Sequence, residues 1–246
     1  MNFEYDNFKI PNCDFKISPS SIGNFFNSPV LWYKEHVTKE SEGFTGSTSS
    51  HLGTIIHAIL EAVGNKEDVN SEEIEDYIDA ITDEAVDKEV IRDNYQMMAE
   101  EVVNTYLLSN MPDSTEKKTY REVLDGIFVG GTYDNITNGT LVDYKTAGKK
   151  PNTEAIPFNY LIQLLAYAWA LKGEGIEIDR VRIVYIVRAT KTLPPRVFEV
   201  NHMISAEDWE MIENTLMLIA DSVDACRKHP ELTHLIFKSM KLKQTK

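Results

Sequence analysis

A tight turn between two strand-like segments is the feature that most constrains how this chain can fold. Within residues 132–146, Asn138-Gly139 separates an apolar run that leads to Asp134 from a second run that leads to Asp143. Asn-Gly between two β-rich segments is the strongest short-range sequence signal for a β-hairpin. The pattern therefore predicts two antiparallel strands that bring two carboxylates together.

The second strand of this hairpin carries an Asp-x-Lys pattern. Residues two apart on a strand point to the same face, so Asp143 and Lys145 project together while Tyr144 points away. Two adjacent carboxylates repel each other unless a cation lies between them, and oxygen ligands of this kind suit Mg²⁺ or Mn²⁺. A lysine beside such an ion can orient or deprotonate a water molecule, as phosphodiester hydrolysis requires. For this tripeptide alone, a surface hairpin whose lysine compensates two acids is the stronger interpretation.

A second hairpin signal precedes the first one. Asp125-Gly126 separates the strand-like runs Thr119–Leu124 and Ile127–Tyr133, so three successive antiparallel strands are expected. Glu122, on the earliest of these strands, is either a neighbour of the acidic cluster or an exposed strand residue.

The first 110 residues have a mainly helical pattern. Ser18 is a candidate N-cap ahead of Pro19, and a further helix is expected over His51–Glu61. Taken alone, His57 on that helix is more often a hydrogen-bonded residue than a metal ligand. A longer amphipathic pattern extends from Ser71 to about Ser109. Residues 1–16 and 40–50 are expected to be irregular.

Helical and strand patterns alternate after the hairpins. An amphipathic helix over Phe158–Leu171 places Gln163 and Tyr167, four residues apart, on one face. The remaining expected elements are strands at Asp179–Val187 and Pro195–Val200 and a terminal helix with a capping-box-like start at Ser205–Asp208.

The formal net charge of −14 is concentrated in one segment. Residues 67–101 hold 14 acidic residues against Lys88 and Arg92, and so account for 12 of the 14 negative charges. We interpret this run as a solvated helix face, with a binding surface for a basic partner as the alternative. Because the rest of the chain is near neutral, a local basic groove for nucleic acid is compatible with the composition.

The sequence also bears on the compartment. No apolar run approaches the roughly 20 residues of a transmembrane helix, and the first residues lack the basic-then-apolar order of a signal peptide. Cys13 and Cys226 are far apart and have no C-x-x-C partner, so neither a disulfide framework nor a cysteine cluster is indicated. A cytosolic protein is expected.

Five groups of residues, in this order along the chain, resemble the motifs of the PD-(D/E)XK nuclease superfamily and, within it, of the RecB/Cas4-like branch. They are Ile17-Ser-Pro-Ser with Phe26-Asn-Ser-Pro-Val30, Gly53-Thr-Ile-Ile-His57, Gly131-Thr-Tyr-Asp134, Val142-Asp-Tyr-Lys-Thr146 and Gln163-Leu-Leu-Ala-Tyr167. Each motif is weak alone, whereas five in order are a specific pattern.

The resemblance implies an α/β fold with a mixed central sheet flanked by helices. A single domain over residues 1–246 is expected, with a mainly helical part at about 17–110, a sheet-containing catalytic core at about 117–230, and a basic tail at about 238–246.

The resemblance also implies residue roles. The ligands of one or two Mg²⁺ or Mn²⁺ ions are expected to be His57, Asp134, Asp143 and the Tyr144 carbonyl. Lys145 is expected to position the attacking water, and Gln163 and Tyr167 to contact a DNA phosphate or orient Lys145. Further DNA contacts are expected at Ser18, Ser20, Thr146, Lys149, Lys150 and the C-terminal lysines. Each of these lysines is alternatively a solvated charge.

The chain departs from the iron–sulfur members of the branch. Ser28 stands where those members have a cysteine before the proline of the first motif, and Cys226 stands alone near the C-terminus. No iron–sulfur cluster is therefore expected, and the departure favours a resemblance to cluster-free, phage-type recombination exonucleases. For a phage-encoded protein the compartment is the cytoplasm of a bacterial host.

The leading hypothesis is a metal-dependent DNA exonuclease that works in recombination, repair or DNA processing. It would supply single strands to an annealing protein or a recombinase, and a homo-oligomer is compatible with it. The alternatives are a structure-specific endonuclease of the same fold and a non-catalytic DNA-binding or assembly subunit.

Overall fold

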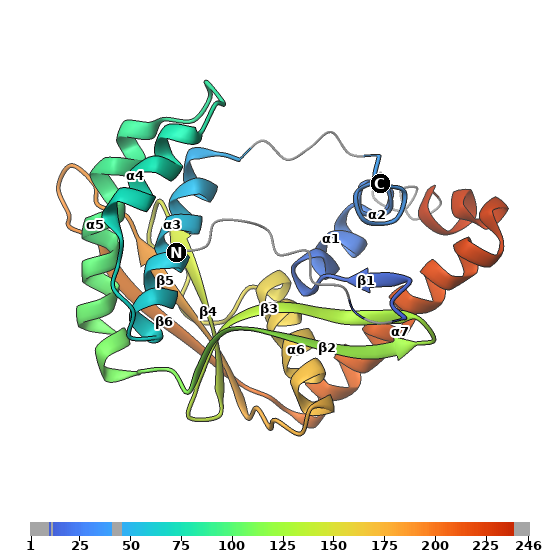
Figure 1. Ribbon diagram of the computed structural model, residues 1–246. Coiled ribbons are helices and arrows are strands. Elements are labelled where there is room, and N and C mark those ends of the chain that lie inside the picture. Colours follow the sequence, from blue (N-terminus) through green and yellow to red (C-terminus); the bar gives the residue numbers. More distant parts are fainter. Residues whose placement is uncertain (1–9, 11, 41–45, 239–246) are drawn as a thin grey trace.

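A mixed β-sheet forms the centre of the computed structural model, which describes residue 10, residues 12–40 and residues 46–238 (Figure 1). The predicted basic tail thus falls outside the described residues except for its first residue. The strands are β1 (Phe15–Ile17), β2 (Ser114–Leu124), β3 (Ile127–Thr137), β4 (Thr140–Ala147), β5 (Arg180–Val187) and β6 (Arg196–Met203). Strands β2, β3 and β4 pair antiparallel in succession, β4 pairs parallel with β5, and β5 pairs antiparallel with β6. The mixed sheet and the three successive antiparallel strands are as predicted.

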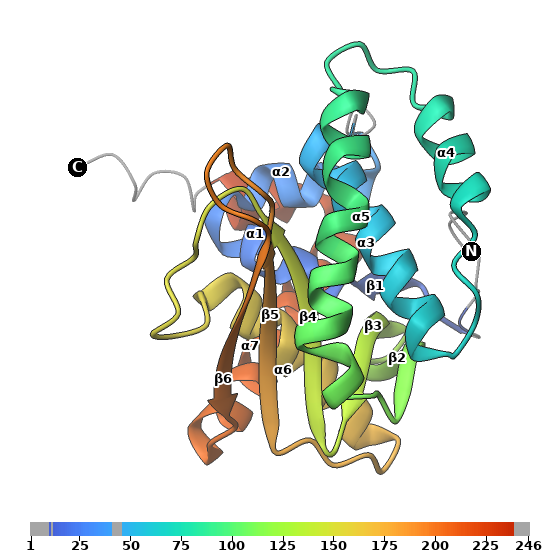
Figure 2. The same ribbon diagram turned by 90° about the vertical axis from the view of Figure 1, so that its left-hand side faces the viewer.

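Helices cover both faces of this sheet (Figures 1 and 2). They are α1 (Ile22–Asn27), α2 (Pro29–Tyr33), α3 (Thr48–Gly64), α4 (Ser71–Ala80), α5 (Lys88–Thr105), α6 (Phe158–Gly173) and α7 (Ala206–Lys228). Short helical turns lie at Pro19–Ser21, Lys34–Thr38, Leu107–Ser109, Pro230–Leu232 and His234–Lys238. Helix α7 begins with the predicted capping box of Ser205 and Asp208.

Two separate apolar layers show which helices cover which face. Val142 and Tyr144 of β4 pack with the apolar sides of α3, α4 and α5. On the other face, α6 packs with β3 and β5, and also with α1, α2 and α7. Because side chains alternate along β4, Asp143 and Lys145 lie on the α6 side while their neighbours face α3. One strand therefore presents residues to both helical layers.

The predicted Asn-Gly turn connects β3 to β4. Asn138 has φ 49° and Gly139 has φ 71°, so both residues occupy the left-handed region. A two-residue hairpin turn of the I′ type needs this conformation at both positions, which is why Asn-Gly is favoured there. The turn sets the pairing of Asn135 with Val142 and of Thr137 with Thr140.

Several expectations about secondary structure were wrong. The loop expected over residues 40–50 ends earlier, because α3 begins at Thr48 with Ser47 as its N-cap. The segment expected to be irregular contains β1, which pairs in parallel with Ile127–Val129 of β3. The long helical pattern after Ser71 is interrupted between α4 and α5, where the Asp87 side chain accepts a hydrogen bond from Val90 N and starts a new helix. Amphipathic periodicity continues across this break, so periodicity alone did not reveal it.

Among the described helices, none combines the length and the apolar character that crossing a membrane requires.

Candidate active site

The site lies where β3 and β4 separate. These strands pair only from Asn135 to Thr137 on β3, so the backbone of Tyr144 has no partner on that strand. Tyr144 N instead donates a hydrogen bond to Asp134 Oδ2 at 2.7 Å, and His57 Nε2 donates to Tyr144 O at 2.9 Å. The unpaired strand edge thus holds an aspartate from β3 and a histidine from α3 beside each other.

The hydrogen bond to Tyr144 O also orients the imidazole of His57. Since a carbonyl can only accept, Nε2 carries a proton, and in the neutral ring Nδ1 then has a free lone pair. Nδ1 lies 3.4 Å from Asp134 Oδ1. A histidine with its outer nitrogen tied to a backbone carbonyl is the usual arrangement of a metal-ligating imidazole.

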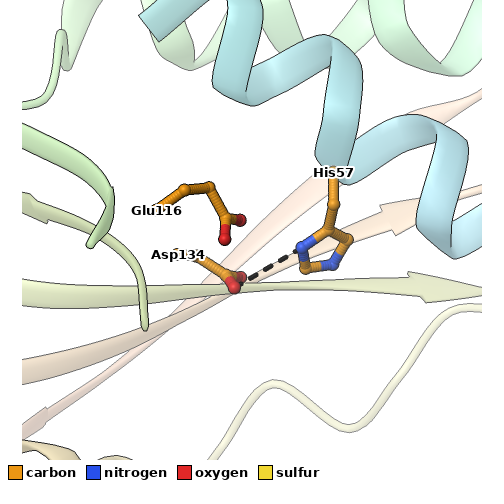
Figure 3. Close-up of side chains that lie close together, drawn as sticks. All are labelled: His57, Glu116 and Asp134. Atoms are coloured by element: carbon orange, nitrogen blue, oxygen red, sulfur yellow. Dashed lines mark ion pairs between the residues drawn. The ribbon is translucent and has the colours of Figure 1, made fainter. Parts of the chain in front are cut away.

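Glu116 completes a cluster with these two residues (Figure 3). One ligand atom from each of His57, Glu116 and Asp134 lies within 4.8 Å of the others, and the three residues come from α3, β2 and β3. Glu116 has φ 47°, a left-handed conformation that is uncommon for this residue type. Such a local distortion in a strand is typical of residues held for a functional purpose.

Asp143 and Lys145 lie beside this cluster on the α6 side. Asp143 Oδ1 accepts hydrogen bonds from Lys145 Nζ at 2.9 Å and from Gln163 Nε2 at 3.1 Å. Asp143 Oδ2 is buried and has no hydrogen-bond partner among the described residues, although Lys145 Nζ lies 2.8 Å away as an ion pair. Lys145 Nζ also lies 5.1 Å from the centre of the Tyr160 ring.

The pair Gln163 and Tyr167 on α6 was predicted to share one face, and both reach the site. Gln163 binds the same oxygen of Asp143 as Lys145 does, so it orients the lysine through the carboxylate rather than by direct contact. Tyr167 is buried, and its hydroxyl lies 3.1 Å from the position that a Cβ atom on Gly131 would occupy. Burial, together with the nearby charges of Asp134 and Asp143, raises the pKa of Tyr167 far above its ordinary value. The hydroxyl therefore remains a proton donor.

The ionisable groups of the site shift one another's pKa values. Burial and the charge of Asp134 raise the pKa of Glu116 to about 8, and the same two causes raise the pKa of Asp143 to about 6. Burial lowers the pKa of His57, but the adjacent Asp134 outweighs it and raises the pKa to about 9, while His57 in turn outweighs burial and lowers the pKa of Asp134. For Lys145, burial is likewise outweighed, chiefly by Asp143, so its pKa rises and the ammonium form is favoured. A bound divalent cation would favour the ionised carboxyl groups and the neutral ring of His57, because metal ligands bind in their deprotonated forms.

Glu122 does not approach this cluster, which corrects the expectation placed on it. Its exposed carboxylate accepts a hydrogen bond from Gly126 N at 3.0 Å, in the turn between β2 and β3. Glu116 lies six residues earlier on the strand, about 20 Å away at the usual rise per residue. Glu122 therefore stabilises the turn, and Glu116 is the acid of β2 that reaches the site.

A register shift explains why the sequence did not reveal Glu116. Leu124 pairs with Ile127 next to the turn, but after an irregularity Glu122 pairs with Phe128. Without this shift, counting back from the turn would have placed Lys117 opposite Asp134 and turned Glu116 to the other face. The extent of β2, which begins at Ser114 rather than Thr119, was also underestimated.

The residues predicted to contact DNA have differing surroundings. Ser18 and Ser20 share a hydrogen bond of 3.0 Å between their hydroxyl groups ahead of α1. Thr146 Oγ1 lies 3.3 Å from the place that a Cβ atom on Gly53 would occupy, so the second and fourth motifs touch. Lys149 and Lys150 are exposed in the loop after β4.

The donor set of this site fits a divalent cation. Imidazole nitrogen and carboxylate oxygens suit Mn²⁺ and Mg²⁺, and the buried Asp143 Oδ2 is an acceptor without a hydrogen bond. The Tyr144 carbonyl accepts one hydrogen bond from His57 and retains a second lone pair.

Several solved structures resemble this fold. A proposed exonuclease from Eubacterium rectale superposes with a TM-score of 0.59 at 13% identity, covering 87% of this chain and 81% of that one. An alkaline exonuclease from Laribacter hongkongensis has a TM-score of 0.42 at 11% identity, with 92% and 94% covered. A phage-related exonuclease from Haemophilus somnus 129PT has a TM-score of 0.40 at 12% identity, with 87% and 95% covered. At these identities the first likeness shows a shared fold alone.

Comparison of the sequence with family models identifies the family of the chain. No curated protein sequence matches it at a significant level. A family model, described as the PD-(D/E)XK nuclease superfamily, matches residues 16–231. This match spans most of the chain and encloses the whole site from His57 to Tyr167, so the chain belongs to the PD-(D/E)XK nuclease superfamily.

Proposed function

We propose that this chain is a divalent-metal-dependent DNA exonuclease that acts in phage-type recombination, repair or DNA processing. The observation that carries the proposal is the meeting of His57, Glu116 and Asp134 beside the Asp143–Lys145 pair where β3 and β4 separate. Hydrolysis at DNA ends is favoured over internal cleavage because the structural neighbour from Eubacterium rectale is itself named as an exonuclease.

In this proposal the residues divide into ligands and a proton-donating group. His57 Nδ1 and the carboxylates of Asp134, Asp143 and Glu116 would hold one or two Mg²⁺ or Mn²⁺ ions, with the Tyr144 carbonyl as a further ligand. A bound ion would supply Lewis-acid stabilisation of the charge that develops on the phosphate oxygens.

The proton-donating group is centred on Lys145. Its ammonium, held by Asp143, donates a hydrogen bond that positions the attacking water or a phosphate oxygen. Gln163 keeps the Asp143 carboxylate in place, and the hydroxyl of Tyr167 is a second donor for the DNA phosphate. Asp143 thus has two functions, because it is both a ligand and the support of Lys145.

The biological setting is part of the proposal. Residues 1–246 act as one nuclease domain in the cytoplasm of a bacterial host, and the single strands produced pass to an annealing protein or a recombinase.

Glu116→Gln should weaken Mn²⁺ binding by at least about tenfold, since even residues that only support a ligand change metal affinity by 10- to 100-fold. Glu122→Gln is the matched control, because it removes the same charge from the same strand and its amide oxygen can still accept from Gly126 N. Titration of Mn²⁺ by calorimetry would measure both variants. Equal affinities for Glu116→Gln and the unaltered protein would remove Glu116 from the ligand set.

An assay on linear duplex and covalently closed circular DNA, with Mg²⁺ or Mn²⁺ and with a chelator, tests the proposed function. We expect the linear duplex to be degraded and the circle to survive, because an exonuclease needs a free end. Rapid nicking of the circle would show an endonuclease. DNA binding without cleavage of either form, under both metals, would show a non-catalytic subunit.

A further inference from the structure

Two loops at one end of the sheet carry a group of basic residues. Because β4 and β5 are parallel, their carboxyl ends lie at the same end of the sheet (Figure 2). The loops that follow them, residues 148–157 and 188–195, therefore begin there. With the first residue of β6, they contribute five basic residues against a single acid, Glu154. We call these five residues the basic rim: Lys149, Lys150, Arg188, Lys191 and Arg196. In a chain with a net charge of −14, such a concentration is a local exception.

Arg188 is the member of the basic rim that is built into the end of β4. Its backbone N–H donates to Ala147 O at 3.0 Å, which extends the parallel pairing by one residue. Its guanidinium Nε and Nη2 lie 3.5 and 3.6 Å from the point where a Cβ atom on Gly148 would lie. Together with Thr146 of the Asp-x-Lys-Thr motif, Arg188 lines a cavity of about 20 Å³, whose other walls include Ser49 and Leu52 of α3 and Met98 of α5. The guanidinium thus lies against the end of β4 on the α3 side of the sheet, the side from which His57 reaches the site.

Three of the five residues of the basic rim have no partner of opposite charge in the described part of the chain. Arg188, Lys149 and Lys191 form no side-chain ion pair or hydrogen bond with any residue that the structure describes. Lys150 Nζ and the Arg196 guanidinium instead lie 5.3 and 5.6 Å from the centre of one ring, that of Phe198. One aromatic ring thus attracts a cation from the loop after β4 and a cation from the start of β6.

The acidic helices behave differently from the basic rim. Arg92 of α5 is bound by three carboxylates, those of Glu75, Asp79 and Glu89. Arg196 of the basic rim lines a surface pocket with Glu101 and Glu199 but forms no ion pair with either. The cations of Arg188, Lys149 and Lys191 have no carboxylate at ion-pair distance among the described residues, so they are available to an external anion.

We propose that the basic rim is the path of the DNA backbone beyond the scissile bond, with Arg188 binding a phosphate close to it. Gly148 is three residues beyond Lys145 on the same strand, or about 10 Å at the usual rise. Phosphates of one strand advance by about 3.4 Å along the duplex axis, so Arg188 falls within about three phosphates of the reacting one. The planar guanidinium can bind a phosphate through two parallel hydrogen bonds, which a surface lysine cannot. The inference rests on the proposed nuclease function and adds the direction in which the substrate lies.

Arg188→Ala should raise the dissociation constant for a short labelled duplex about tenfold, measured with Ca²⁺ in place of Mg²⁺. It should also reduce the slope of log affinity against log salt by about 0.9, the contribution of one duplex phosphate contact. The dissociation constant of Arg188→Lys should lie between those of the unaltered protein and Arg188→Ala, because lysine keeps the charge but lacks the planar fork. Cleavage at saturating DNA should change by less than about twofold, since Arg188 contacts no reacting atom.

Arg180→Ala is the matched control. Arg180 begins β5, at the opposite end of the strand from Arg188. Its removal changes the net charge by the same amount but leaves the basic rim intact. Arg180→Ala should leave the dissociation constant and the salt slope unchanged. Equal weakening by both variants would overturn the proposal, because the effect would then be one of overall charge.

Three further outcomes test the proposed role of the basic rim separately from the nuclease function. Unchanged binding by Arg188→Ala, or no DNA binding by the unaltered protein, would contradict the proposed role of the rim. Weaker binding by Arg188→Ala in a protein that cleaves no DNA would support that role and contradict the proposed exonuclease activity. If the alanine variant does not fold, Arg188→Gln keeps much of the packing against Gly148 and should show the same loss of affinity.

Discussion

Asp134→Asn should reduce cleavage of linear DNA by at least about 10³-fold. The Asp134 carboxylate lies close to both His57 and Glu116. Its replacement by an amide removes a charge on which metal binding is proposed to depend. Metal ions contribute several kcal/mol of charge stabilisation to phosphoryl transfer, and each factor of ten corresponds to about 1.4 kcal/mol. The initial rate of nucleotide release at saturating Mg²⁺ measures the effect.

The fold should survive this substitution. Asparagine can still accept the hydrogen bond from Tyr144 N, which joins β3 to the edge of β4. The thermal unfolding midpoint in a chelator should therefore be similar, while the stabilisation of the unaltered protein by Mn²⁺ should be lost. Asp125→Asn, in the exposed turn between β2 and β3, is the matched control and should retain both activity and stabilisation by Mn²⁺. Full activity of Asp134→Asn would contradict the assignment of the site.

Lys145→Ala and Lys145→Arg should each lose cleavage by roughly 10²-fold or more, the usual scale for the loss of one positioned hydrogen-bond donor. Lys145 Nζ lies 2.9 and 2.8 Å from the two oxygens of Asp143. Arginine keeps the charge but replaces the compact ammonium with a wide planar fork. The loss should appear in kcat at saturating DNA.

Binding of DNA in Ca²⁺ should survive in both lysine variants, because one phosphate-facing cation among several contributes little of the affinity. Lys117→Ala, an exposed change on β2, should leave kcat unchanged. A near-normal kcat for Lys145→Ala would remove the lysine from the mechanism. This pattern is opposite to the one expected for Arg188, whose loss should weaken binding and spare kcat.

The hairpin shows how much local sequence can determine. Asn138-Gly139 predicts a two-residue turn because few other residue pairs accept a positive φ at both positions. The turn, with the alternation of side chains along β4, places Asp143 and Lys145 on one face and Tyr144 on the other. Gln163 and Tyr167 share a face of α6 for an equally local reason, the period of the helix.

The contacts of the same residues required the tertiary structure. Gln163 was expected to contact a DNA phosphate or to orient Lys145, and the structure shows how it can orient the lysine: both side chains bind the Asp143 carboxylate. His57 lies on α3, and only the packing of that helix across β4 brings its imidazole to the Tyr144 carbonyl. No pattern within either segment encodes this distance.

The sequence by itself determined the turns, the alternation of faces and the order of the motifs, because each depends on interactions between residues near each other in the chain. The tertiary structure alone decided that Glu116, and not Glu122, reaches Asp134, and that Arg188 lies beside Gly148. The first depends on a shift in the register of β2 against β3, and the second on the parallel pairing of β4 with β5. Pairing between separate strands depends on the packing of the whole sheet, and a shift of one residue turns every later side chain to the opposite face.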